Sequence, residues 1–139
     1  MRVVIDTNVL LMSIPKGSKY RLIFDALISG KYQLIISNEI LSEYLEIIEQ
    51  KTTAQIAKNI GEFILNSRVV DKIEVFYKWN LITKDPDDNK FVDCAIAGNV
   101  KYVVTNDKHF NELQTIEFPR VDVISIEGFL AELENLGNK

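Results

Sequence analysis

The sequence predicts an α/β domain in three layers, an α/β/α sandwich with a mostly parallel central sheet of about five strands. Short apolar, β-branched runs alternate along the chain with segments whose apolar residues recur at helical spacing. Two of these runs, residues 2–5 and 101–104, resemble strands buried on both faces, and they lead into Asp6 and Asp107. Ligand crevices of open α/β sheets lie beyond the carboxyl ends of the strands, so an active site is expected at that edge.

The expected elements of the first half follow from caps and apolar spacing. Ser18 or a neighbour caps a helix that Gly30 ends, and a short aliphatic strand follows at 33–36. Ser37 caps a second helix running to about residue 50. The pattern Thr52-Thr-Ala-Gln55 is typical of a capping box, which predicts a third helix.

The second half begins with residues 69–83, which suit either a short helix and strand or an irregular crossing. Pro86 breaks the chain, and Asp88 is placed to cap a helix over 89–98 that contains Cys94, expected in the core. The remaining expected elements are a strand at 101–104, a short helix at 107–113, a strand at 121–124 after Pro119, and a helix from Ser125 through Leu136.

Composition sets limits on the class of protein. With 139 residues, 47% hydrophobic and 26% charged, residues 1–139 are expected to fold as one globular domain. No apolar run approaches the ~18 residues of a spanning helix, and a signal-peptide pattern is lacking, so we expect a cytoplasmic protein without membrane contact. A net charge of −4 argues against a global basic field for nucleic acid. Lys16, Lys19 and Arg21 follow Asp6 closely enough in the sequence to serve a phosphate backbone, although each of them singly is more typical of a solvated loop or helix-end charge.

Acidic residues are the candidates for chemistry: Asp6, Glu43, Asp88 and Asp107, with Asp93 as a fifth. Singly, each also suits a turn, a helix cap or a solvated helix face. Jointly, separate segments bring them to the same side of a parallel sheet. Converging carboxylates repel one another and lose hydration, so the cluster calls for a cation, most simply Mg²⁺ or Mn²⁺.

Spacing alone leaves two choices open. Glu39 and Glu43 share a helix face, so either could lean over the site. Asp88 and Asp93 would lie about 140° apart on a helix at ~100° per residue, but Asp88 as a non-helical cap could turn back beside Asp93.

Four segments, taken in order, resemble the PIN-domain family over nearly the whole chain. They are Val4-Ile-Asp6-Thr-Asn8-Val-Leu10, Ile36-Ser37-Asn-Glu-Ile-Leu-Ser-Glu43-Tyr-Leu45, Asp85-Pro-Asp-Asp88-Asn-Lys-Phe-Val-Asp93-Cys-Ala95 and Val104-Thr105-Asn-Asp107-Lys-His-Phe110. The pattern is most similar to bacterial toxin components of toxin–antitoxin systems, relatives of VapC-type ribonucleases.

The resemblance implies a role for individual residues. The implied catalytic acids are Asp6, Glu43, Asp88 and Asp107; the implied metal ligands are Asp6, Asp88, Asp93 and Asp107; the implied supporting residues are Asn8, Ser37 and Thr105. Glu43 is accordingly expected to point into the cleft and Glu39 toward solvent. Asn106 departs from the family pattern, in which a small residue is expected.

The implied function is a metal-dependent endoribonuclease that hydrolyses RNA phosphodiester bonds to leave 5′-phosphates, using one or two Mg²⁺ or Mn²⁺ ions. It would be the toxin of a type II toxin–antitoxin pair. Its expected partners are RNA, an antitoxin protein and a second copy of the chain. Apolar residues on two successive helices could supply a dimer seam or an antitoxin groove, although ordinary core packing is their commoner use: Tyr44, Ile47, Ile48, Phe63 and Ile64.

Other functions remain as alternatives. One is a non-catalytic PIN-like module for RNA binding or assembly, which loss of an acid would favour; none is lost. Another is a phosphotransfer domain, either a receiver or a haloacid-dehalogenase-like phosphatase, but Asn8 stands where the phosphatase needs its second aspartate. His109 is the only histidine, so the sequence lacks the Cys/His spacing of a zinc site. No histidine is expected in the acidic cluster, and a mechanism with paired imidazoles is therefore disfavoured.

Overall fold

Five parallel strands form one sheet in the order β3-β2-β1-β4-β5 in the computed structural model, which describes residues 1–137. Residues 138 and 139, the end of the expected domain, lie outside that range. The strands are β1 (Arg2–Ile5), β2 (Gln33–Ile36), β3 (Val70–Lys72), β4 (Tyr102–Val104) and β5 (Val123–Ile124). The prediction of a parallel sheet of about five strands is confirmed, and β4 and β5 begin later than expected.

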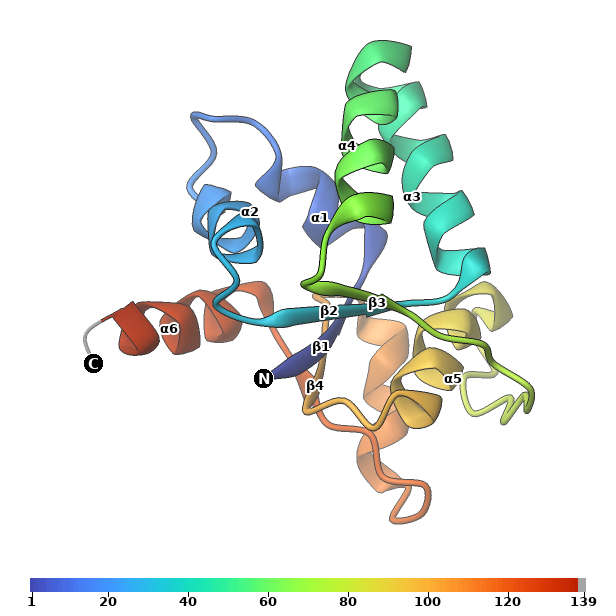
Figure 1. Cartoon of the computed structure of the whole chain (residues 1–139). Helices are drawn as coiled ribbons and strands as arrows, with labels where there is room; N and C mark the ends of the chain where they lie inside the picture. The colour runs from blue at the N-terminus through green and yellow to red at the C-terminus, as the bar shows by residue number, and fades with distance from the viewer. Residues whose placement is uncertain (138–139) are drawn as a thin grey trace.

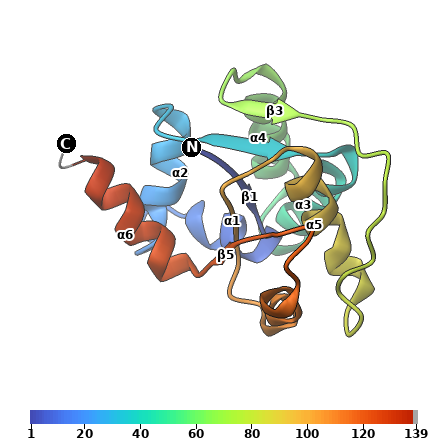
Figure 2. The same ribbon diagram turned by 90° about the horizontal axis from the view of Figure 1, so that it is seen from below.

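Helices cover both faces of this sheet. They are α1 (Thr7–Ser13), α2 (Arg21–Ile28), α3 (Asn38–Lys51), α4 (Ala54–Asn66), α5 (Asn89–Ala97) and α6 (Ile126–Gly137), with 3₁₀ helices η1 (Pro86–Asp88) and η2 (Lys108–Thr115). Figure 1 shows α1 to α4 above the sheet and α5 below it, together with the orange segment that contains η2. In Figure 2 the same molecule is seen from below, with α6 beside α2, which it contacts. The three-layer prediction is therefore confirmed.

The sheet order places a topological switch point between β1 and β4. The chain passes from β1 to β2 to β3 in one direction and then returns through α5 to β4, on the other side of β1. Ile5 pairs with Val104, and the Asp6 N–H donates to the Val104 carbonyl at 3.0 Å. The crevice expected at such a point lies beyond the ends of these two strands.

Some local expectations are wrong by a residue or more. The helix α1 was not expected, because Val9 and Leu10 continue the apolar run of β1. Ser18 does not cap α2; its hydroxyl accepts from the Tyr20 N–H and donates to the Met12 carbonyl, which fixes the preceding turn. The cap of α4 is Thr53, one residue later than the capping box predicts.

Other predicted helix ends are confirmed. The Ser37 hydroxyl accepts from the Ile40 N–H at the start of α3, and the Ser125 hydroxyl accepts from the Gly128 N–H at the start of α6. Gly30, with φ of 76°, follows α2 in a conformation that side chains disfavour. Asp88 occupies the cap position of α5, but its side chain makes no capping hydrogen bond.

Residues 69–83 contain β3 and then an irregular crossing over α5. The Asn89 amide donates to the Ile82 carbonyl at 2.9 Å and accepts from the Ile82 N–H at 2.8 Å. The Glu112 carboxylate accepts from the backbone and the hydroxyl of Thr83. Side chains from α5 and η2 therefore hold this segment in place of a regular hydrogen-bond ladder.

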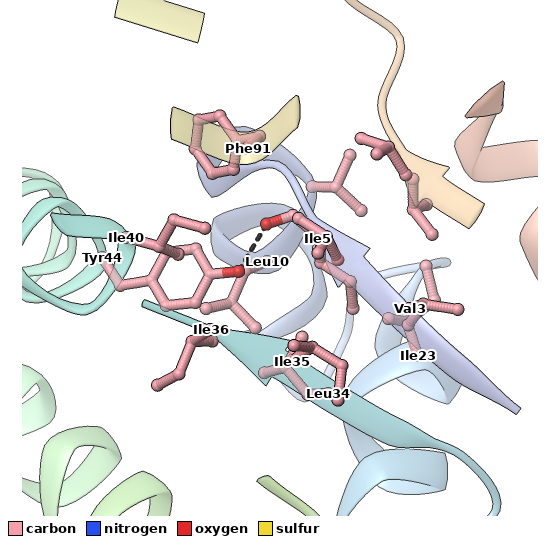
Figure 3. Close-up of a cluster of buried hydrophobic side chains, with 14 of the residues drawn as sticks. Val3, Ile5, Leu10, Ile23, Leu34, Ile35, Ile36, Ile40, Tyr44 and Phe91 are labelled. Carbon is pink, nitrogen blue, oxygen red and sulfur yellow. Dashed lines mark hydrogen bonds between the residues drawn. The ribbon is translucent and has the colours of Figure 1, made fainter. Parts of the chain in front are cut away.

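The core lies on both sides of β1 and β2, whose residues 3–5 and 34–36 are fully buried (Figure 3). The Tyr44 hydroxyl donates to the Ile5 carbonyl at the end of β1, which the dashed line in Figure 3 marks. Cys94 is buried in this core, as expected.

Most of the apolar residues proposed for a dimer seam are also core. Tyr44, Ile48 and Ile64 are buried within the chain, and Phe63 packs on Phe24 with ring centroids 6.0 Å apart. Their use as ordinary core residues is confirmed, so these buried side chains are not available to a partner. Within residues 1–137, no helix has both the length and the apolar character that crossing a membrane requires.

Candidate active site

Three aspartates meet at the carboxyl edge of the sheet. Asp6 follows β1, Asp107 follows β4 by way of Thr105, and Asp88 lies where η1 joins α5. Because β1 and β4 are hydrogen-bonded neighbours, their ends bring Asp6 and Asp107 to the same crevice. The charges of Asp6 and Asp107 both act on Asp88, so all three carboxylates share one electrostatic environment.

Asp6 is 7% exposed. Burial raises the pKa of its carboxyl, which hydrogen bonds from the Thr105 side chain and the Asn8 backbone partly lower again; the charges of Asp107 and Glu43 raise it further. The Thr105 hydroxyl donates to Asp6 Oδ2 at 2.7 Å and also accepts from the Asp107 N–H at 3.0 Å. Thr105 thus links two of the acids, whereas Asn8 acts through its backbone and has an exposed side chain.

Asp88 carries the largest perturbation in this cluster. Burial, followed by the charge of Asp107 and a hydrogen bond with its carboxyl, raises the pKa of Asp88 to about 7, and Asp85 and Asp6 act in the same direction. Its Oδ2 atom is buried without a hydrogen-bond partner among residues 1–137. The folded chain therefore assembles carboxylates here without enough positive charge to stabilise them.

Glu43, and not Glu39, is the acid of α3 that faces this crevice. The Thr7 hydroxyl donates to Glu43 Oε2, and Lys90 Nζ lies 2.7 Å from Glu43 Oε1. Lys90 Nζ also lies 3.0 Å from Asp87 Oδ1. Burial alone would lower the pKa of Lys90, but its contacts with Glu43 and Asp87 raise it overall, so the ammonium group stays charged.

Asp93 is not brought to this cluster. Its Oδ1 accepts from the Trp79 N–H at 3.1 Å, and the charged groups acting on it are Glu39 and Lys78. Burial raises the pKa of its carboxyl. It lines a cavity of about 450 Å³ together with Ser37, which caps α3, and this cavity adjoins the crevice at Lys90.

Sequence reasoning missed three members of the site: Asp85, Lys90 and His109. His109 Nδ1 lies 3.2 Å from Asp107 Oδ1, 3.5 Å from Asp88 Oδ2 and 3.6 Å from Asp85 Oδ2. The expectation that no histidine lies in the acidic cluster is therefore wrong, because η2 turns the residue two positions after Asp107 back toward the carboxylates. A mechanism with paired imidazoles remains disfavoured, since the sequence has one histidine.

The departure at Asn106 has a structural reason. Its side-chain oxygen accepts from the Ile126 N–H at 2.9 Å, which satisfies a backbone donor in the first turn of α6. A small residue at this position would leave that donor without this partner. Asn106 therefore ties the strand end that carries Asp107 to the closing helix.

The donor set suits a divalent cation. Ligand atoms of Asp85, Asp88 and His109 all lie within 4.8 Å of one another. Asp107 Oδ1 lies 3.2 Å from the Nδ1 atom of the same histidine. Carboxylate oxygens suit Mg²⁺ and Mn²⁺, and an imidazole nitrogen suits transition metals. The unpartnered atoms Asp88 Oδ2 and His109 Nδ1 fit the same interpretation, because a cation would satisfy both.

Comparison with known proteins bears on the family and the fold. A family model described as "PIN domain" matches residues 2–109. A search of curated protein sequences finds no significant match.

Solved structures of similar fold include VapBC2 from Rickettsia felis bound to a promoter DNA fragment, with a TM-score of 0.60, 19% identity, and coverage of 90% of this chain and 98% of that chain. VapC20 from Mycobacterium tuberculosis, a toxin that cleaves the sarcin-ricin loop, has a TM-score of 0.59, 13% identity, and coverage of 83% and 97%. DNA-bound VapBC from Salmonella typhimurium has a TM-score of 0.59, 15% identity, and coverage of 91% and 98%.

Proposed function

The chain belongs to the PIN domain family, and from that premise we propose that it is a metal-dependent endoribonuclease acting as the toxin of a type II toxin–antitoxin pair. We further propose that residues 1–139 work as one domain. The observation that carries the activity is the meeting of Asp6, Asp88 and Asp107 at the paired ends of β1 and β4, where Asp88 Oδ2 is buried without a hydrogen-bond partner among residues 1–137. Burial and the charge of Asp107 raise the pKa of Asp88 there to about 7. Such an arrangement costs folding stability and is typical of an active site.

We propose that Asp6, Asp88 and Asp107 hold the catalytic cation, Mg²⁺ or Mn²⁺. When bound, this ion would lower the pKa of a water molecule and stabilise negative charge on the attacked phosphate. Thr105 keeps the Asp6 carboxylate in position, and its contact with the Asp107 backbone fixes the second strand end relative to the first. Both primary carboxylates are thus oriented before any ion binds.

Glu43 has a different role in this proposal. The Thr7 hydroxyl and the Lys90 ammonium group already occupy its carboxylate, so we assign Glu43 to orienting the nucleophile rather than to the primary ligand set. Lys90 holds Glu43 at the crevice as a positioning residue. Asp93, which binds the Trp79 backbone, is assigned to anchoring the irregular segment over α5.

RNA cleavage by the purified protein tests the enzymatic part. We expect wild type to cleave single-stranded RNA with Mg²⁺ or Mn²⁺, to leave 5′-phosphates, and to lose activity in EDTA. Asp6→Asn and Asp107→Asn should abolish cleavage, while Asp122→Asn, an exposed acid beyond the crevice, should retain it. Cleavage that survives in Asp6→Asn would contradict the proposal, and RNA binding by wild type without cleavage would indicate a non-catalytic module.

The toxin role is supported by the VapBC and VapC structures of similar fold. Expression of the chain should arrest growth, and co-expression with the product of an adjacent small gene should restore it. The Asp6→Asn variant provides the matched control, because it should bind the same inhibitor but cause no arrest. We also propose a homodimer, which light scattering tests: a monomer at every accessible concentration would refute that assembly.

A further inference from the structure

We propose that Asp85, Asp88 and His109 form a second cation position next to the catalytic one, and that this position takes a transition-metal ion in preference to Mg²⁺. The inference rests on the proposed metal-dependent function, because Asp88 would be shared between the two positions. It assigns a ligand role to Asp85 and His109, neither of which is an acid of the implied catalytic set.

The geometry converges on His109 Nδ1. Asp88 Oδ2 lies 3.5 Å from this nitrogen and Asp85 Oδ2 lies 3.6 Å from it. These separations exceed good hydrogen bonds but match two ligands of one ion, since Zn–N and Zn–O distances of ~2.0–2.2 Å place neighbouring ligands at about 3–3.5 Å. The Asp85 side chain is held in place by its other oxygen, Oδ1, which accepts from the Asp87 N–H at 3.3 Å and leaves Oδ2 for the ion.

Unpaired atoms point to a ligand between these groups. Asp88 Oδ2 and His109 Nδ1 are the buried side-chain nitrogen and oxygen atoms without a hydrogen-bond partner within residues 1–137. They face each other, although leaving a buried polar atom unpaired costs ~1–3 kcal/mol. A cation bound by both atoms would give each of these buried atoms a partner.

The imidazole nitrogen decides which cation fits. Mg²⁺ takes oxygen ligands in a strict octahedral arrangement, whereas Mn²⁺, Co²⁺ and Zn²⁺ accept imidazole together with carboxylates. His109 is fixed for this role, because its backbone N–H donates to Asp107 Oδ1 at 2.9 Å at the start of η2. The alternative use of the ring is as an imidazolium paired with these two carboxylates and with Asp107, whose Oδ1 lies 3.2 Å from His109 Nδ1.

A spectroscopic experiment separates these two uses. Because the chain has one histidine, any imidazole coupling to a bound metal must come from His109. The untagged protein is produced with ¹⁵N-labelled histidine, stripped of metal, loaded with Mn²⁺ and examined by pulsed electron paramagnetic resonance. We expect a ¹⁵N coupling in wild type and none in His109→Ala, with Asp122→Asn as the matched control that retains it.

Affinity measurements add an independent readout. Calorimetric titration of the metal-free proteins should show that His109→Ala and Asp85→Asn weaken Co²⁺ binding by about 10-fold or more, the scale seen when groups of a metal site are removed. Mg²⁺ binding should change much less. His109→Asn, which preserves size and polarity, replaces the alanine variant if melting in EDTA shows that the latter is unfolded.

The outcomes distinguish this inference from the proposed function. Mn²⁺ binding and RNA cleavage without a ¹⁵N coupling would overturn the second position and leave the ribonuclease intact. Equal losses of Co²⁺ and Mg²⁺ affinity in His109→Ala would also overturn it, because the nitrogen would then confer no preference. Failure of wild type to bind any divalent ion would overturn both proposals.

Discussion

Replacing Asp88 by asparagine should stabilise the metal-free protein, even though it removes a proposed metal ligand. In the folded chain the pKa of Asp88 rises from its ordinary 3.8 to about 7, chiefly through burial and then through Asp107. At ~1.36 kcal/mol per pKa unit, the difference corresponds to about 4 kcal/mol as an upper limit. Because solvent reaches the crevice and screens the charges, we expect the stabilisation to be about 1–2 kcal/mol.

The direction with pH follows from this raised pKa. Below pH 3.8 the carboxyl is protonated in both the folded and the unfolded chain, so Asp88 costs no stability there. Between pH 3.8 and about pH 7 the unfolded chain releases the proton first, and the cost grows to its full value above about pH 7. The advantage of Asp88→Asn should therefore be largest in alkaline solution and vanish in acid.

Thermal and urea unfolding in EDTA measure this effect. In alkaline buffer, we expect Asp88→Asn to melt about 3–8 °C above wild type. Asp87→Asn is the matched control: it removes a neighbouring carboxylate whose side chain is 73% exposed, so its effect should be small and nearly independent of pH. Adding Mn²⁺ should stabilise wild type more than the variant. An Asp88→Asn protein that melts at or below the wild-type temperature in alkaline EDTA would refute the reasoning.

Three further substitutions probe the groups that support the site. Lys90→Met should cost about 1–3 kcal/mol by urea unfolding, since Glu43 is left half-buried without its cation, and Lys90→Arg should recover most of the loss. Tyr44→Phe should lower the free energy of unfolding by about 1–2 kcal/mol and weaken Mn²⁺ binding measured by calorimetry, because the Tyr44 hydroxyl donates to the last carbonyl of β1, just before Asp6. Unchanged Mn²⁺ affinity would show that this hydrogen bond stabilises the core alone. Asn106→Ala should lower the free energy of unfolding by about 1 kcal/mol and preserve RNA cleavage, because it removes the acceptor for a backbone N–H in the first turn of α6. A loss of cleavage at equal stability would contradict this structural role for Asn106.

The sequence predicts most of the sheet because its central strands are short and uniformly apolar. The runs at β1, β2 and β4 bury nearly every side chain, which separates them from the amphipathic helices. The helix α1 could not be predicted from the apolar pattern, because its apolar residues continue the run of β1 without a break. The path of the segment after β3 could not be predicted either, because side chains from later elements, such as Asn89 and Glu112, hold it in place.

Part of the candidate site could also be predicted from the sequence. Asp6 and Asp107 follow from strand ends, because parallel strands bring their carboxyl ends to one edge. The choice of Glu43 over Glu39 needed the family resemblance, since both acids fit one helix face. His109 and Lys90 could not be assigned from spacing, because each reaches the crevice through contacts between elements that are distant in sequence.

The long separation between Asp6 and Thr105, 99 positions apart in the chain, bears on the order of events during translation. A nascent chain that ends before β4 carries Asp6 but lacks both the neighbouring strand and Asp107. Contacts of such long range form only after the intervening chain is available, so no product that ends before β4 holds the full set of acids. For a proposed ribonuclease this delay has a protective effect, since the ribosome that synthesises it is largely RNA and the crevice closes only when most of the chain has been made.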